Sequence, residues 1–419
     1  MAPEPMTNLL ASQCRPPVGA PVAVTRRPPS LWPRNRRRAL MAAVLLWTVP
    51  MFVVAALVIH NPLRHTVTLG SYHPSAENWW AGRSLYVGPS GMNYLPQFAV
   101  LYSPFHFLPL KWSEVLWRFC AAATLAGGLW LLSRALFSAE PEGPFLWATI
   151  LALPLCLGAL RNGNANAIFG GVTLLAVVAT LQQRWWLAVG WMVLATAIKP
   201  LGVVLFLLAA IHYAPVARRL PAALFGLALF PFFFGRPDYV LAQYREAWRN
   251  LHACAAVTEN RFADFNGVLR TLGAPLSPGP STGVRLLAGG VTALIWRWGA
   301  RRLNPGLGCL GLYALATAYL MLFNPMNEVN SYVILAPALG AWGAWFLFSD
   351  ETGGRRFGWG LVVMALSMGL LPVVVRPFFG NRFALCWLPC MTILFVGALI
   401  HCMSRPGVGQ PAPQPAAHP

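Results

Sequence analysis

Carboxylates and cationic side chains that could carry out group transfer lie in a few polar segments of this chain. Glu77, Asp264 and Glu328 are carboxylates, and a positioned carboxylate can remove the proton of a hydroxyl group. Lys199 follows an apolar stretch, where a charge is costly and indicates a partner or an anionic ligand. A lysine whose amine extends to the membrane interface explains Lys199 as well. These groups suit a reaction in which a hydroxyl is deprotonated while cations stabilise a departing phosphate.

The other candidates are polar residues in the same segments. His73 and Glu77 are four positions apart, so they share one face of a short helix that Pro74 can begin and Gly82 can end. That helix also fits an interfacial anchor for the segment. The remaining candidates for substrate binding are Arg83, Arg161, Asn164, Asn166, Asn327, Asn330 and Tyr332.

The composition excludes a soluble globular protein. Of the 419 residues, 57% are hydrophobic and 10% are charged, whereas soluble domains carry about 25% charged residues. The mean hydropathy is +0.55. Lys and Arg number 31 against 12 Asp and Glu, and seven arginines lie in the first 38 residues, which is typical of a cytoplasmic anchor beside anionic lipid rather than of a nucleic-acid site. The cysteines are scattered and predict no zinc site, and we expect no metal or cofactor.

Long apolar runs predict an all-α polytopic membrane protein with about 12 transmembrane helices, within a range of 10–13. We expect a disordered basic tail over residues 1–38, a multi-pass domain over 39–403 and a disordered tail over 404–419. Two long loops, about 61–112 and 236–282, hold most of the polar candidates. The predicted helices lie near 39–59, 115–135, 144–160, 166–182, 186–198, 200–213, 220–235, 283–300, 306–323, 331–348, 357–373 and 383–402.

Arginine placement predicts the orientation. With both termini in the cytoplasm, every short cytoplasmic loop carries arginine, as the positive-inside bias requires. The long loops and the candidate residues then face the outside. Prolines over residues 94–109 predict a broken or re-entrant element there, and Pro200 divides the apolar stretch around it into two short helices or one broken span. No Gly-rich phosphate loop is present that would indicate ATP or nucleotide-sugar chemistry.

Four short motifs, in order, resemble those of glycosyltransferase family 87. The first runs from Trp80 to Tyr86 and is followed by Tyr94-Leu95-Pro96 and Ser103-Pro104-Phe105. The second is Gly163-Asn164-Ala165-Asn166, similar to a Gly-Gln-x-Asn turn. The third is Lys199-Pro200, and the fourth runs from Asn324-Pro325 to Tyr332. The resemblance covers about residues 60–340 and implies a GT-C-like membrane fold with juxtamembrane helices on its outer face.

The resemblance also implies an activity and a location. Relatives transfer a sugar, typically mannose, from a polyprenyl-phosphate donor, with inversion and with an acidic residue in the first outer loop as base. We expect transfer of a mannose-like hexose or a pentose to a lipid or glycan acceptor, at the outer face of a bacterial inner membrane.

The first outer loop contains no aspartate, and Glu77 is its one acid, so Glu77 is the base candidate with Glu328 and Asp264 as alternatives. Lys199, Arg83 and Arg161 are then candidates for the phosphate. His73, the asparagines and Tyr332 are candidates for the cavity wall. A transporter or lipid flippase, or a non-catalytic membrane subunit, is the alternative interpretation.

Overall fold

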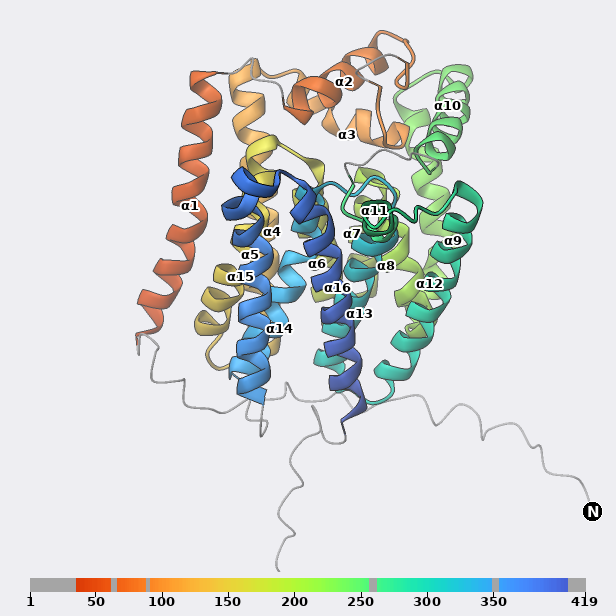
Figure 1. Cartoon of the computed structure of the whole chain (residues 1–419). Coiled ribbons are helices and arrows are strands. Elements are labelled where there is room, and N and C mark those ends of the chain that lie inside the picture. The colour runs from red at the N-terminus through yellow and green to blue at the C-terminus, as the bar shows by residue number, and fades with distance from the viewer. Residues whose placement is uncertain (1–34, 62–65, 88–90, 256–261, 349–353, 406–419) are drawn as a thin grey trace, which may run out of the picture.

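The computed structural model of the chain is a bundle of helices, described over residues 35–61, 66–87, 91–255, 262–348 and 354–405 (Figure 1). No strand occurs in these residues. The long helices run roughly parallel to one another, as expected where backbone groups must be satisfied within each segment in lipid. The bundle consists of α1 (Arg36–His60), α4 (Leu110–Leu136), α5 (Glu142–Asn162), α6 (Ala165–Leu181), α7 (Trp185–Ile198), α8 (Gly202–His212), α9 (Ala214–Leu229), α12 (Pro278–Ala300), α13 (Pro305–Phe323), α14 (Ala336–Phe348), α15 (Gly354–Phe379) and α16 (Arg382–Ser404).

Every apolar run predicted from the sequence coincides with one of these helices. Seven helices of the described chain are long and apolar enough to cross a membrane, namely α1, α4, α5, α9 with its 3-10 extension η2 (Phe230–Phe233), α13, α15 and α16. Four shorter apolar helices, α6, α7, α8 and α14, stand among them. The all-α polytopic class is therefore confirmed, whereas the count of about 12 spans stays a prediction.

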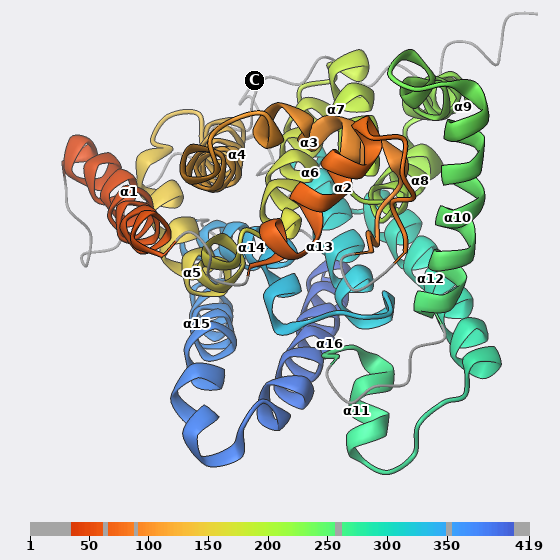
Figure 2. The ribbon, with the colours of Figure 1, turned by 90° about the horizontal axis from the view of Figure 1, so that it is seen from above.

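The shorter elements lie at the end of the bundle opposite the start of α1 (Figure 1). They are α2 (His73–Trp80), α3 (Pro96–His106) and α10 (Pro237–Ala255), and from above α2 and α3 extend across the bundle (Figure 2). Helix α11 (Phe265–Thr271) follows in the second long loop. A π-helical turn, η1 (Thr68–Tyr72), leads into α2, and a 3-10 turn, η3 (Val329–Ile334), precedes α14. We call this end of the bundle the capped end.

Three details differ from or refine the sequence prediction. Helix α1 begins at Arg36, within the predicted tail, because the Asn35 side chain accepts a hydrogen bond from the Arg37 N–H and caps it. The stretch around Pro200 forms two separate helices, α7 and α8, which pack against each other. The prolines of the first loop allow a regular 11-residue helix, α3, that begins at Pro96. The predicted tails otherwise lie outside the described residues.

Small residues let the central helices approach closely, as is common in membrane bundles. A methyl group on Gly340 of α14 would lie 2.5 Å from the backbone oxygen of Ala148 in α5. Gly340→Ala should therefore force these helices apart and lower the free energy of unfolding by roughly 1–3 kcal/mol. The measurement is thermal and denaturant unfolding of the detergent-solubilised protein.

Gly308→Ala in α13 is the matched control, because no heavy atom lies within 4 Å of the added methyl group. Alanine has the higher helix propensity, so this variant should gain up to about 1 kcal/mol. Equal effects of the two substitutions would contradict the close approach of α5 and α14.

Candidate active site

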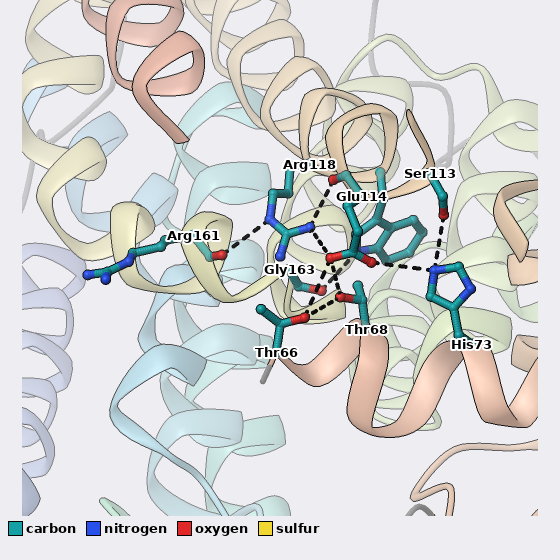
Figure 3. Close-up of polar contacts among 9 residues, drawn as sticks. Thr66, Thr68, His73, Ser113, Glu114, Arg118, Arg161 and Gly163 are labelled. Carbon is teal, nitrogen blue, oxygen red and sulfur yellow. Dashed lines mark hydrogen bonds and ion pairs between the residues drawn. The ribbon is translucent and has the colours of Figure 1, made fainter. Parts of the chain in front are cut away.

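A buried ion pair lies at the capped end of α4 (Figure 3). The Arg118 Nη1 atom donates to Glu114 Oε2 at 2.8 Å, and both side chains are 1% exposed. The Thr68 hydroxyl donates to the same carboxylate oxygen at 2.7 Å. Thr66 Oγ1 lies 2.7 Å from Thr68 Oγ1 and extends this network. The pair joins residues one helical turn apart, and Thr68 attaches η1 to it.

The end of α5 holds Arg118 in place. Gly163 ends this helix with a φ of +67°, a conformation that favours glycine, and its carbonyl accepts from Trp117 Nε1 at 2.8 Å. The Arg161 carbonyl accepts from Arg118 Nε at 3.2 Å. These orphan carbonyls at a helix end are thus satisfied by side chains of α4. The Glu114–Arg118 pair is fixed from both sides.

His73 lies on the other side of Glu114. Its Nε2 atom is 3.4 Å from Glu114 Oε1 and 3.2 Å from the Ser113 hydroxyl oxygen (Figure 3). Glu114 Oε1 is buried and has no hydrogen-bond partner among the described residues, whereas Oε2 is occupied. The His73 side chain is 14% exposed, so it connects the buried carboxylate to the surface. A buried carboxylate whose oxygen Oε1 has only this one ion-pair contact is costly, which is typical of functional sites.

Glu114 lines a cavity of about 430 Å³ between α1, α4, α5 and α15. Arg161 and Arg376 contribute guanidinium groups, and Asn330 contributes an amide. Leu57 and Val58 of α1 supply an apolar side. The cavity therefore combines one buried carboxylate, two cations and an apolar wall, a combination that fits an amphiphilic phosphate ester.

A second polar cluster surrounds two tyrosines beneath α2. The Tyr72 and Tyr94 hydroxyl oxygens are 3.0 Å apart, and Tyr72 accepts from the Ala165 N–H at 2.9 Å. The half-buried Lys199 places Nζ 5.4 Å from the centroid of the Tyr94 ring, a cation–π contact. Burial, with a smaller contribution from the negative charge of Glu328, raises the pKa of Tyr94 to about 12. Tyr94 thus stays a neutral donor beside the Lys199 ammonium.

The predicted residues take three kinds of position. Arg161 and Asn330 line the cavity, His73 contacts Glu114, and Lys199 belongs to the tyrosine cluster. Residues of the second kind hold turns of the backbone in place. Asn164 caps α6, and Asp264 caps α11. Asn166 donates to Ser331, Asn327 donates to the carbonyls of Leu320 and Met321, and Tyr332 donates to the carbonyl of Ala263.

The third kind lies on the surface. Glu77 is 62% exposed and forms an ion pair of 2.7 Å with Arg83, which is 56% exposed. Glu328 is exposed at the start of η3. Among the three carboxylates predicted as base candidates, only Asp264 is buried, and burial raises its pKa. Its carboxylate accepts from the Gly267 N–H, as a helix cap does. The roles predicted for these residues stay predictions.

Glu114, Arg118 and Arg376 are site residues that the sequence reasoning missed. Glu114 lies between the predicted loop, which ends at about 112, and the predicted helix, which begins near 115, so neither prediction included it. A signal was present: an acidic and a basic residue four positions apart at the end of a membrane span are expensive unless they pair, and they mark functional positions.

Comparison with known proteins identifies the class. The model of glycosyltransferase family 87 matches residues 93–325, and the chain belongs to this family. The sequence-based resemblance is confirmed.

Two curated relatives are polyprenol-phosphate-mannose-dependent alpha-(1-2)-phosphatidylinositol pentamannoside mannosyltransferases. The protein of Mycobacterium tuberculosis is 24% identical over 66% of this chain and 64% of its own length. That of Mycolicibacterium smegmatis is 26% identical over 66% of this chain and 67% of its own length. The match thus spans about two thirds of each relative. Among solved structures, ArnT from Cupriavidus metallidurans in the apo state aligns with 85% of this chain and 77% of its own, at 16% identity and a TM-score of 0.42.

Proposed function

We propose that this protein transfers a sugar, mannose-like or a pentose, from a polyprenyl-phosphate donor to a lipid or glycan acceptor, with inversion at the anomeric carbon. Membership of family 87 and the mannosyltransferase relatives support this proposal. The observation that supports it most directly is the environment of Lys199. This half-buried ammonium has no carboxylate within ion-pair distance in the described chain and lies against the Tyr94 ring, so it is available to an anion.

We further propose that the capped end faces the outside of a bacterial inner membrane and that both termini are cytoplasmic. Arginines concentrate at the helix ends away from the capped end, which supports this orientation. These residues are Arg36, Arg37, Arg38, Arg134, Arg184, Arg218, Arg219, Arg297, Arg301, Arg302, Arg355, Arg356 and Arg405. A cysteine-labelling experiment on intact cells tests it, since a cysteine at position 78 should react and one at position 184 should not.

The activity is tested with purified protein in lipid vesicles, radiolabelled polyprenyl-phosphate mannose and an extract of bacterial membrane lipids. Appearance of labelled product supports the proposal. Movement of the labelled donor between leaflets without any product would instead indicate a flippase, and neither product nor movement would indicate a non-catalytic subunit.

Lys199→Met should raise the KM for the donor roughly 10–100-fold, because a hydrogen bond to a charged group contributes about 1.5–3 kcal/mol. Lys111→Met is the matched control: Lys111 is exposed at the same end of the bundle and lines no part of the cavity described above. An unchanged donor KM in Lys199→Met would show that the ammonium binds no phosphate.

A further inference from the structure

The base of the transfer reaction can be sought among the carboxylates at the capped end. Glu77 is 62% exposed and is compensated by an ion pair with Arg83, so it lies on the surface. Asp264 is used as the cap of α11, and Glu328 is exposed. Glu114 differs from all three. It is 1% exposed, lines the cavity and keeps one oxygen without a hydrogen bond in the described chain.

We propose that Glu114 is the general base and that the acceptor hydroxyl binds in the cavity that Glu114 shares with Arg161 and Arg376. This inference rests on the proposed sugar transfer. The acceptor O–H proton passes to Glu114, and the acceptor oxygen forms a bond to the anomeric carbon of the donor. The bond from that carbon to the phosphate oxygen breaks, and its electron pair leaves with the polyprenyl phosphate.

The surroundings of Glu114 fit this role. Arg118 and Thr68 bind Oε2 and fix the plane of the carboxylate, whereas Oε1 is itself buried and forms an ion pair with His73. His73 Nε2, 3.4 Å from Oε1, lies between that oxygen and the surface. His73 is therefore a positioning residue that can carry the proton outward after the transfer.

The two arginines of the cavity, Arg161 and Arg376, can bind a negatively charged group of a substrate. In Figure 3 the Arg161 side chain extends away from Glu114, and its carbonyl rather than its guanidinium contacts Arg118. Neither Arg161 nor Arg376 forms an ion pair with a carboxylate of the described chain. These guanidinium groups can bind a negatively charged group of the acceptor, while the donor phosphate binds Lys199, and Leu57 and Val58 supply an apolar wall to the acceptor site.

Glu114→Gln tests the role of the base, with Asp238→Asn as the matched control, because Asp238 is a 71% exposed carboxylate of α10 that lines no part of the cavity. We expect kcat to fall about 10²–10⁴-fold in Glu114→Gln, with the donor KM nearly unchanged, and to stay within about twofold in Asp238→Asn. The wild-type rate should decline in acid as Glu114 becomes protonated. The residual activity of Glu114→Gln should lack this decline. Arg118 and His73 contact Glu114, and Arg161 and Arg376 line the same cavity, so the pH dependence of the rate is compared with that of His73→Gln.

Chemical rescue distinguishes a purely structural role of Glu114 from a role as the general base. Glu114→Ala, purified as a monodisperse protein, should regain part of its transfer rate when formate is added, because formate restores a carboxylate in the vacated space. If wild type transfers sugar and Glu114→Gln keeps half of its kcat, or formate restores nothing, Glu114 is not the base while the proposed function stands. If wild type transfers no sugar from any polyprenyl-phosphate donor, both proposals are overturned.

Discussion

Replacing Arg118 by methionine should lower the free energy of unfolding by about 3–5 kcal/mol, because it leaves the Glu114 carboxylate buried and uncompensated. Both partners of this pair are 1% exposed, so water cannot take the place of the guanidinium. Methionine keeps much of the packing volume, which restricts the effect to the lost charge. Unfolding of the detergent-solubilised protein, followed by tryptophan fluorescence, measures the change.

Arg36→Met is the control for an exposed ion pair. Arg36 contacts Glu140 at 2.6 Å, but the two side chains are 58% and 47% exposed. Exposed pairs contribute about 0–1 kcal/mol, so this variant should unfold almost as wild type does. The double variant Glu114→Gln with Arg118→Met should be more stable than Arg118→Met alone, since it removes the unpaired charge. A loss below about 1 kcal/mol in Arg118→Met would contradict the buried pair.

Gly163→Ala should cost about 2–4 kcal/mol and slow sugar transfer. Its φ of +67° is strained for any residue with a Cβ atom. An added methyl group would also lie 2.9 Å from both Arg118 Nη2 and Thr68 Cγ2, atoms of two residues that bind Glu114. The substitution thus disturbs the carboxylate without touching it. Unfolding and transfer assays on the same preparation measure both effects.

Gly82→Ala isolates the backbone contribution. Gly82 has the same φ of +67°, and no heavy atom lies within 4 Å of an added methyl group. It should cost only the conformational penalty of about 1–2 kcal/mol. Equal losses in the two variants would mean that the contact with Arg118 and Thr68 has no energetic consequence.

Much of the fold could be predicted from the sequence, because an apolar segment in lipid must satisfy its own backbone hydrogen bonds and therefore forms a helix. Each predicted run became a helix, and Pro74 and Gly82 bound the short helix α2 as expected. The separation of α7 from α8 was left open, because Pro200 is compatible with a break or a reversal. Only the packing of the two helices against each other decides between them.

The site was predicted less completely. Polar residues in loops were visible, and Arg161, Asn330, His73 and Lys199 do lie in the clusters at the capped end. Glu114 was not predicted because it lies inside a helix, where one charged residue hardly changes the mean hydropathy of a mostly apolar segment. Its partners come from η1 and α2, and the end of α5 contacts Arg118, but no local pattern reveals contacts between positions more than 40 apart.

The lengths of α7 and α8 place the chemistry at an unusual depth. A helix of 14 residues rises about 21 Å, and one of 11 residues about 17 Å, whereas the hydrocarbon core is about 30 Å thick. Helix α3 contacts α7 and occupies part of this missing height. Where short helices border the lipid, the bilayer can thin to match them, at an elastic cost. We therefore expect the transfer rate to depend on the thickness of the surrounding lipid.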